Sequence, residues 1–215
     1  MKVVCLWSGG KDSCLACYKA SQQGYRIISL FNFISENGFS LSHGLSSELI
    51  FNQVKMLDIP LVQKVMPKKT YREQFKDLIN EWKKEKEIKG NVFGDIYLQE
   101  HKDWIDRICQ EVEVKAVMPL WGLDTKKLIR EFIDSGFEAI VVTTDANILG
   151  PEELGLKIDQ SFIERLKPGI DPCGERGEFH TFVYNGPGFR QAVKFKTGRK
   201  IFKDHHWFLE LSPSF

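Results

Sequence analysis

The 215-residue sequence has no apolar run long enough to span a membrane, and its first apolar stretch is too short for a signal peptide. It also lacks an excess of either charge, because 30 Lys and Arg residues stand against 29 Asp and Glu residues, which leaves a net charge of +1. We therefore expect no membrane association. The near-neutral charge also argues against nucleic acid as a partner.

Cysteine is scarce, with five residues that are odd in number and scattered along the chain. This pattern favours free thiols in a reducing compartment, so we expect a cytoplasmic protein. Cys14 and Cys17 have the spacing of a redox pair, but on a helix they share one face and packing is the favoured role. A structural zinc site would need two more ligands, and no suitably spaced pair is present.

Internal repeats and low-complexity tracts are also absent, and 42% hydrophobic with 27% charged residues is ordinary for a globular protein. At roughly 150 residues per domain the length suggests one domain with an appendage, or two small ones. We place one domain at residues 1–149 and a smaller C-terminal region at residues 150–215.

Short apolar runs alternate with longer amphipathic stretches through the first two-thirds of the chain. Such alternation predicts βαβ units and a parallel sheet, and runs that are apolar throughout favour strands covered on both faces. The expected strands are 2–7, 25–34, 59–66, 91–96, 116–121 and 138–144, and the expected helices are 12–22, 46–57, 70–87, 98–112 and 124–135.

The pattern changes after about residue 150, where Gly150 and Pro151 break the chain. A short helix is expected over 159–166, and residues 171–189 are rich in glycine and proline. The stretches 190–196 and 199–211 predict a hairpin that turns around Thr197 and Gly198.

The segment Ser8-Gly9-Gly10-Lys11-Asp12-Ser13 lies between the first expected strand and the first expected helix. A helix N-terminus presents unpaired N–H groups to an anion, and the two glycines let the backbone approach a phosphate closely. The lysine adds positive charge, the serines offer hydroxyl groups, and Asp12 can cap the helix or hold a Mg²⁺ that bridges phosphates. A plain strand-to-helix turn is the less favoured interpretation.

In an open parallel sheet, ligands bind beyond the carboxyl ends of the strands. That edge should carry Ser8, Asn32 to Ser35, Gly94 and Asp95, Trp121 and Gly122, and Thr144 and Asp145. Asp95 could bind a metal or a substrate amine, with a helix cap or solvated turn equally favoured. Trp121 and His43 could line a nucleotide pocket. Core packing is an equal alternative for Trp121, and an ordinary loop position is the commoner role for His43.

A second charged and glycine-rich cluster runs from Asp171 to Thr181. Glycines at 174 and 177 free the backbone around Glu175, and Glu178 and His180 are two apart, so that on a strand they would share a face. A carboxylate beside an imidazole can act as a general base. Two residues are too few for a metal site alone, and a surface turn with an incidental ion pair is the plain alternative.

The phosphate-loop motif, SGGKDS, resembles that of the N-type ATP pyrophosphatases. The resemblance implies a parallel sheet of the adenine nucleotide α-hydrolase-like (HUP) type with a small C-terminal α+β subdomain. It also implies ATP cleavage between the α- and β-phosphates, with Mg²⁺ as cofactor. On this reading Ser8, Gly9, Gly10, Lys11, Asp12 and Ser13 hold the phosphates, and Asn32, His43, Gly94, Asp95, Trp121 and Gly122 lie around the nucleotide.

Together with Gly94-Asp95-Ile96, Pro119-Leu120-Trp121 and the Gly-Glu-x-Gly-Glu-Phe-x-Thr pattern at 174–181, the motif is similar to the diphthine–ammonia ligase family. That family uses ATP and ammonia to amidate diphthine, a modified histidine of elongation factor 2. The resemblance places Glu175 and Glu178 in the reacting cleft. Asp95, Arg176 and His180 depart from the family pattern, so we expect a sister group.

These observations predict an ATP-dependent amide-forming ligase that releases AMP and pyrophosphate through an acyl-adenylate. Lys11 and Asp12 would stabilise the phosphates, and Glu178 or His180 would act as base for ammonia. Another phosphate-loop enzyme that amidates or thiolates a small molecule or tRNA is one alternative. A non-catalytic adenine-nucleotide sensor is another. The acceptor is expected to be a protein, and the sequence leaves a homodimer open.

Overall fold

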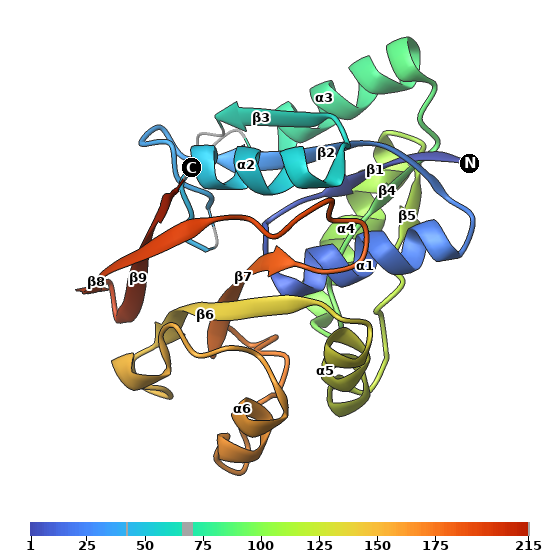
Figure 1. Cartoon of the computed structure of the whole chain (residues 1–215). Helices are drawn as coiled ribbons and strands as arrows, with labels where there is room; N and C mark the ends of the chain where they lie inside the picture. The colour runs from blue at the N-terminus through green and yellow to red at the C-terminus, as the bar shows by residue number, and fades with distance from the viewer. Residues whose placement is uncertain (42, 66–70, 215) are drawn as a thin grey trace.

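A computed structural model describes residues 1–41, 43–65 and 71–214 (Figure 1). Positions 66 and 70, which end one predicted strand and begin one predicted helix, lie outside these residues. The N-terminal part alternates strands and helices as predicted. Its elements are β1 (Lys2–Leu6), α1 (Lys11–Gln22), β2 (Arg26–Ile34), α2 (Ser47–Leu57), β3 (Leu61–Val65), α3 (Tyr71–Lys86), β4 (Gly90–Val92), α4 (Gln99–Glu111), β5 (Lys115–Val117) and α5 (Thr125–Asp134).

The first five strands form one parallel sheet in the order β3-β2-β1-β4-β5. This confirms the expected α/β fold class with a central parallel sheet. Strands β4 and β5 are only three residues long and shorter than predicted, so Asp95 and Trp121 lie in the loops that follow them. Because α1 begins directly after β1, its N-terminus lies at the carboxyl edge of the sheet.

Two apolar clusters cover the two faces of this sheet. Val4 and Phe31 pack on one side with the buried residues of α3 and α4, including Phe75 and Ile108. Val3 and other β1 and β2 residues pack on the other side with α1, α2, α5 and the C-terminal strands. The alternation of neighbouring β1 residues between the two clusters follows from the two-residue period of a strand, and it explains why these strands are apolar throughout.

The C-terminal strands form a separate antiparallel sheet in the order β7-β6-β9-β8 (Figure 1). Its members are β6 (Glu138–Asp145), β7 (Phe179–Asn185), β8 (Phe195–Lys203) and β9 (His206–Pro213). The sixth predicted strand therefore exists, but its expected place in the parallel sheet is wrong, and Thr144 and Asp145 do not lie on that sheet's edge. The two sheets divide the strands between β5 and β6, while the division at residue 149 stays a prediction.

The terminal hairpin is present, but the predicted turn around Thr197 and Gly198 is wrong. The turn is made by Asp204 and His205, which both have positive φ angles, 49° and 61°. Gly198 lies inside β8, where the register with β9 shifts between Thr197 and Lys200. A glycine in a strand can thus mark a bulge rather than a turn.

Between the sheet strands of the C-terminal part lie a short 3₁₀ helix (Pro151–Glu153) and α6 (Gln160–Arg165). Asp159 caps α6 by accepting a hydrogen bond from the Phe162 N–H at 2.9 Å, which explains why the predicted helix begins there. Among the described residues, no helix has both the length and the apolar character needed to cross a bilayer.

Candidate active site

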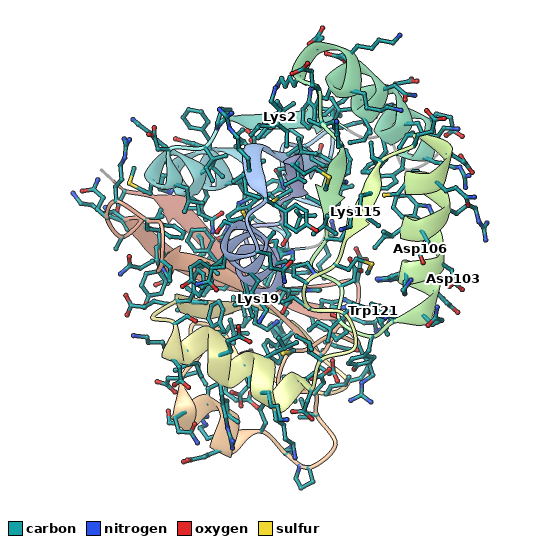
Figure 2. The ribbon with its side chains drawn as sticks, turned by 90° about the vertical axis from the view of Figure 1, so that its right-hand side faces the viewer. Lys2, Lys19, Asp103, Asp106, Lys115 and Trp121 are labelled. Carbon is teal, nitrogen blue, oxygen red and sulfur yellow. The ribbon has the colours of Figure 1, made fainter. Side chains whose placement is uncertain are left out.

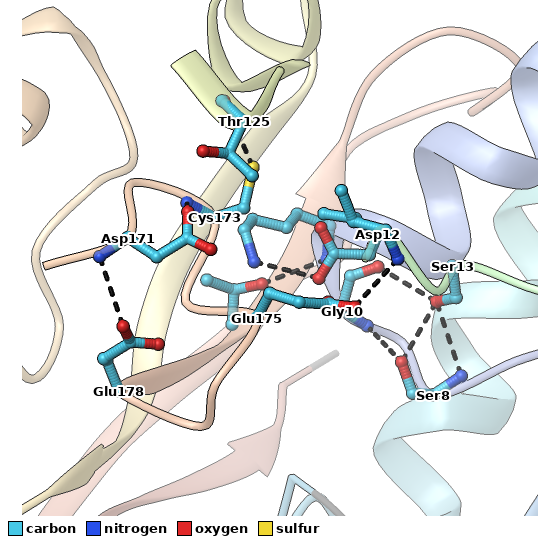
Figure 3. A network of polar contacts seen from close by, with 12 residues as sticks. Ser8, Gly10, Asp12, Ser13, Thr125, Asp171, Cys173, Glu175 and Glu178 are labelled. Atoms are coloured by element: carbon cyan, nitrogen blue, oxygen red, sulfur yellow. Dashed lines mark hydrogen bonds and ion pairs between the residues drawn. The ribbon is translucent and has the colours of Figure 1, made fainter. Parts of the chain in front are cut away.

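The phosphate-loop motif folds as a tight turn from β1 into α1 (Figure 3). The Ser8 and Ser13 hydroxyl oxygens lie 3.1 Å apart, and the Gly10 N–H donates to Ser8 Oγ at 3.3 Å. Gly10 is the N-cap of α1 and has no side chain to accept from the first turn. The helix thus begins with a loop of small residues and hydroxyl groups, the arrangement expected of an anion site.

Gly9 has a positive φ of 83°, and a side chain there would clash with Ile50 of α2. Gly10 is pressed from the other side, since a Cβ atom on it would clash with His43 Nε2 and lie 3.2 Å from the Thr181 carbonyl oxygen. Close packing therefore adds to the preference for glycine at both positions, and at Gly9 the positive φ angle favours glycine as well.

Lys11 is only 3% exposed, and its Nζ lies 2.9 Å from Asp12 Oδ2. Burial alone favours the neutral amine, but the charges of Asp12 and other neighbours, including Glu175, raise the pKa of Lys11 overall. For Asp12, burial raises the pKa more than the lysine lowers it, and Asp171 and Asp95 add to the rise. Lys11 therefore keeps its positive charge at the start of α1, and the carboxyl group of Asp12 lies against it.

Glu175 comes from the C-terminal region and reaches the loop after β4. Its Oε1 accepts from the Ile96 N–H at 2.8 Å and from the Tyr97 N–H at 3.4 Å. Burial, with further contributions from Asp12 and Asp95, raises the pKa of Glu175 to about 7. Figure 3 draws Glu175 near Asp12. A carboxyl group with this pKa can accept or release a proton near neutral pH.

Glu178 is 1% exposed and is held by its own loop. Its carboxylate accepts from the Asp171 N–H at 3.2 Å and the Arg176 N–H at 3.0 Å, and Arg176 Nη2 donates to it at 2.7 Å. Figure 3 draws it apart from Asp12, on the far side of the loop. These contacts indicate that Glu178 stabilises the loop of residues 171–178.

His180 does not share partners with Glu178. Its ring lies 4.6 Å from the ring of His43, which itself lies over Gly10. Burial, followed by the charges of Lys11 and His206, lowers the pKa of His180 to about 4, and burial also lowers the pKa of His43 well below its usual range. Both imidazoles are therefore neutral at physiological pH.

The structure places the remaining predicted nucleotide residues at different depths. Asn32 is 2% exposed and donates to the Trp7 carbonyl at 2.8 Å, so its amide is engaged inside the sheet. Gly94 packs against the first turn of α1, since a Cβ on it would lie 2.9 Å from the Asp12 carbonyl carbon. Asp95 pairs with His101 at 3.0 Å.

Trp121 and Gly122 lie in the loop between β5 and α5. Lys102 Nζ lies 5.7 Å from the centre of the Trp121 ring, and Figure 2 shows Trp121 near the N-terminal end of α4. Gly122 is exposed, with its N–H donating to the Ile96 carbonyl at 2.7 Å. Both residues therefore border the loop that Glu175 contacts.

Sequence reasoning missed Gln53 and did not single out Thr181. Thr181 Oγ1 accepts from the Lys11 N–H at 3.0 Å and so caps the helix across 170 residues. Gln53 is fully buried and donates to the Gly9 carbonyl at 2.9 Å. One signal was available for Gln53, because it occupies a core-facing position of α2 beside Leu49, Ile50 and Val54.

A groove of about 1200 Å³ opens between the segment that follows β2 and the β8–β9 hairpin, and Thr143 and His180 are part of its lining. Since the ring of His180 lies against that of His43, which is next to Gly10, this groove reaches the neighbourhood of the phosphate loop. In the described part of the chain, no three His, Cys, Asp or Glu side chains gather as a metal site.

Two models of known protein families match the chain over most of its length. Residues 1–116 match the family model of the diphthamide synthase N-terminal domain, and residues 124–213 match that of the diphthamide synthase C-terminal domain. The chain belongs to the diphthamide synthase family. This confirms the predicted family resemblance, and with it the expectation of an enzyme of the ATP-dependent ligase class.

Curated relatives of this diphthamide synthase family member carry the name diphthine–ammonia ligase. The protein of Rattus norvegicus is 26% identical over an alignment of 228 positions that covers 94% of this chain and 85% of the relative. The Homo sapiens protein is 27% identical over 90% of this chain and 82% of its own length. The Schizosaccharomyces pombe protein is 24% identical over 90% of this chain but only 36% of its own length.

A solved structure, titled a predicted subunit of tRNA methyltransferase from Methanocaldococcus jannaschii, covers 87% of this chain and 98% of its own. Its TM-score is 0.47 and its sequence identity is 17%. Membership of the diphthamide synthase family rests on the two family models, and the names of the relatives agree with it.

Proposed function

We propose that this chain is an ATP-dependent ligase that converts a carboxylate into an amide with ammonia through an acyl-adenylate. The observation that supports it best is the convergence of Lys11 and Asp12, at the start of α1, with Glu175 from the C-terminal region. A lysine charge suited to a phosphate and a titratable carboxyl group thus lie close together in a member of the diphthamide synthase family, which supports the proposal.

In the first step a carboxylate oxygen of the acceptor attacks the α-phosphorus of ATP. The bond from the α-phosphorus to the bridging oxygen breaks, and pyrophosphate leaves. The residues Ser8 to Ser13 hold the phosphates, and Lys11 stabilises the charge that develops on the leaving group. Mg²⁺ bound to phosphates needs only one or two protein carboxylates, and Asp12 is the carboxylate on this loop.

In the second step the ammonia nitrogen attacks the acyl carbon, the carbon–oxygen bond to AMP breaks, and the amide forms. The nitrogen must lose a proton. We assign that proton to Glu175, whose pKa of about 7 suits a base at neutral pH, in preference to the residues expected from sequence. His180 binds a proton too weakly, with its pKa lowered by burial to about 4, and Glu178 is engaged by Arg176.

For the acceptor we propose diphthine on elongation factor 2, as in the names of the relatives. The groove beside His180 is large enough to admit a polypeptide segment, which supports a protein acceptor. Asn32, His43, Gly94, Asp95, Trp121 and Gly122 are proposed to surround the nucleotide at the carboxyl edge of the sheet.

The test is incubation with ATP labelled in the α-phosphate, ammonium and elongation factor 2 that carries diphthine. We expect AMP, pyrophosphate and the amidated acceptor in equal amounts. ADP as the sole nucleotide product would contradict the adenylation step. The Lys11→Ala variant serves as the matched control, and we expect it to lose AMP formation while its unfolding by urea shows that it is folded.

A further inference from the structure

The peptide between Gly9 and Gly10 is held from one side by the side chain of Gln53. Gln53 Nε2 donates to the Gly9 carbonyl at 2.9 Å and to the Val183 carbonyl at 2.6 Å. Gln53 Oε1 accepts from the Trp7 indole N–H at 2.8 Å. The Val183 N–H donates to the same Gly9 carbonyl at 3.0 Å. The buried amide therefore joins Trp7, which directly follows β1, the phosphate loop and β7, and each of its polar atoms has a partner.

The orientation of this peptide matters for an anion. In a planar trans peptide the C=O and the following N–H point in opposite directions. Because the Gly9 oxygen faces Gln53 and Val183, the Gly10 N–H faces the other way, toward Ser8 Oγ at 3.3 Å. The peptide has glycine on both sides and so is the one in the loop with the fewest steric restraints. Rotation of its plane would turn a carbonyl oxygen toward the phosphates.

We propose that Gln53 is a positioning residue that prevents this rotation and so keeps the Gly10 N–H on the Ser8 side of the loop, where a phosphate oxygen can replace Ser8 Oγ as its acceptor. The inference rests on the proposed use of residues 8–13 as a phosphate loop, but it requires only that the loop binds phosphate and not that ATP is cleaved. Gln53 acts through the Gly9 carbonyl and does not touch the substrate.

Strand β7, at the edge of the antiparallel sheet, also helps to hold the Gly9–Gly10 peptide. Strand β7 is an edge strand, and its Val183 backbone groups bond to Gly9 and Gln53. Thr181, on the same strand, bonds to the Lys11 N–H. An edge strand normally leaves such groups unpaired. Here they bond to the phosphate loop. Gln53 therefore links the orientation of the Gly9–Gly10 peptide to the position of the antiparallel sheet.

Two variants distinguish the proposed positioning role of Gln53 from a general role in packing. Gln53→Met keeps the length of the side chain but removes both N–H donors. Trp7→Phe removes only the donor to Gln53 Oε1 and leaves both bonds that Gln53 donates. We measure the binding of MgATP and of inorganic pyrophosphate by titration calorimetry. We expect at least a tenfold loss of affinity for both probes in Gln53→Met, and a change of less than about threefold in Trp7→Phe.

A spectroscopic measurement reports on the peptide itself. In protein labelled with ¹⁵N-glycine, pyrophosphate should shift the Gly10 amide signal of the wild-type chain, and the shift should be lost in Gln53→Met. The inference is overturned if folded Gln53→Met binds both probes as the wild type does, if the two variants lose affinity equally, or if the wild type binds neither probe.

Urea unfolding at the assay temperature checks that each variant is folded. If Gln53→Met does not fold, Gln53→Glu takes its place, because it keeps the shape and can still accept from Trp7, yet as a carboxylate it has no N–H to donate. The wild-type titration also separates this inference from the proposed function. Pyrophosphate binding without AMP production would contradict the proposed ligase activity but not the positioning role of Gln53.

Discussion

Glu175 is the residue whose protonation should govern the second step of the reaction. Burial and the neighbouring Asp12 and Asp95 raise its pKa to about 7, so that the carboxylate form is present above that pH and is lost below it. At a constant concentration of free ammonia, we expect the rate of amide formation to rise with pH up to about 7 and then level off. The measurement is single-turnover amidation between pH 5.5 and 8.5.

The Glu175→Gln variant should lose this pH dependence and, at pH 8, should be slower by about 100-fold or more, the usual contribution of a general base. His180→Asn is the comparison, because the pKa of His180, about 4, lies below the range of the assay. A Glu175→Gln enzyme that keeps the wild-type pH profile would exclude Glu175 as the base.

Glu178 and Arg176 give a prediction about stability. The buried Glu178 carboxylate keeps two backbone N–H donors when the arginine is removed, but it loses the guanidinium. We expect Arg176→Met to lower the free energy of unfolding only modestly, because Arg176 is half exposed and its charge is partly solvated. Urea denaturation measures this. Glu178→Gln in the same chain should restore part of the loss, and an additive double variant would contradict the coupling.

At this scale the sequence predicts what is local. Residues 8–13 are adjacent in the chain, and their composition and position sufficed to predict the turn from β1 into α1, while their binding of phosphate stays a prediction. Gln53 contacts Gly9 and Val183 across 44 and 130 residues. Its polarity inside an apolar helix face was visible in the sequence, but its partners were not. The same holds for Glu178, whose environment is set by Asp171 and Arg176 as well as by the strand that follows.

The strands and helices show where sequence patterns stop being informative. Strand β6 has the uniform apolar run of a parallel strand, yet it pairs antiparallel with β7 and β9. An apolar run shows that a strand is buried on both faces and does not specify the sheet to which it belongs. Likewise Gly198 resembles a turn residue, whereas the hairpin turns at two residues that are not glycine.

That turn provides a prediction at the scale of one element. Asp204 and His205 both adopt the left-handed conformation, which is the pattern of a two-residue type I′ hairpin and favours Asn-Gly. A left-handed conformation costs about 1–2 kcal/mol for a residue with a Cβ, and the extra chain entropy of glycine when unfolded offsets part of that gain. We expect His205→Gly to stabilise the protein by up to about 1 kcal/mol.

Thermal unfolding of His205→Gly, compared with Gly198→Ala, tests the assignment of the turn. A Cβ at Gly198 would lie 3.1 Å from the Cβ of Glu210, so we expect that control to be neutral or destabilising. If the turn were at residues 197 and 198, the control would show the larger loss and His205→Gly would have no effect.

At the scale of the whole molecule, the two sheets meet at the phosphate loop. The Gly9 carbonyl and the Lys11 N–H both bond to β7, and the apolar cluster that includes β1 and α1 continues into β6 and β7. A ligand on the loop should therefore stabilise both sheets together, although the two family models divide the chain between residues 116 and 124.

MgATP at 100 times its dissociation constant contributes about 2.7 kcal/mol to stability if it binds only the folded chain. For a chain of this length that corresponds to a rise in Tm of roughly 5–10 °C. We expect one calorimetric transition that moves as a whole when MgATP is added, and no shift in Lys11→Ala. Two transitions of which only one responds to nucleotide would show that the sheets unfold independently. In that case the contacts between β7 and the phosphate loop would not couple the stability of the antiparallel sheet to nucleotide binding.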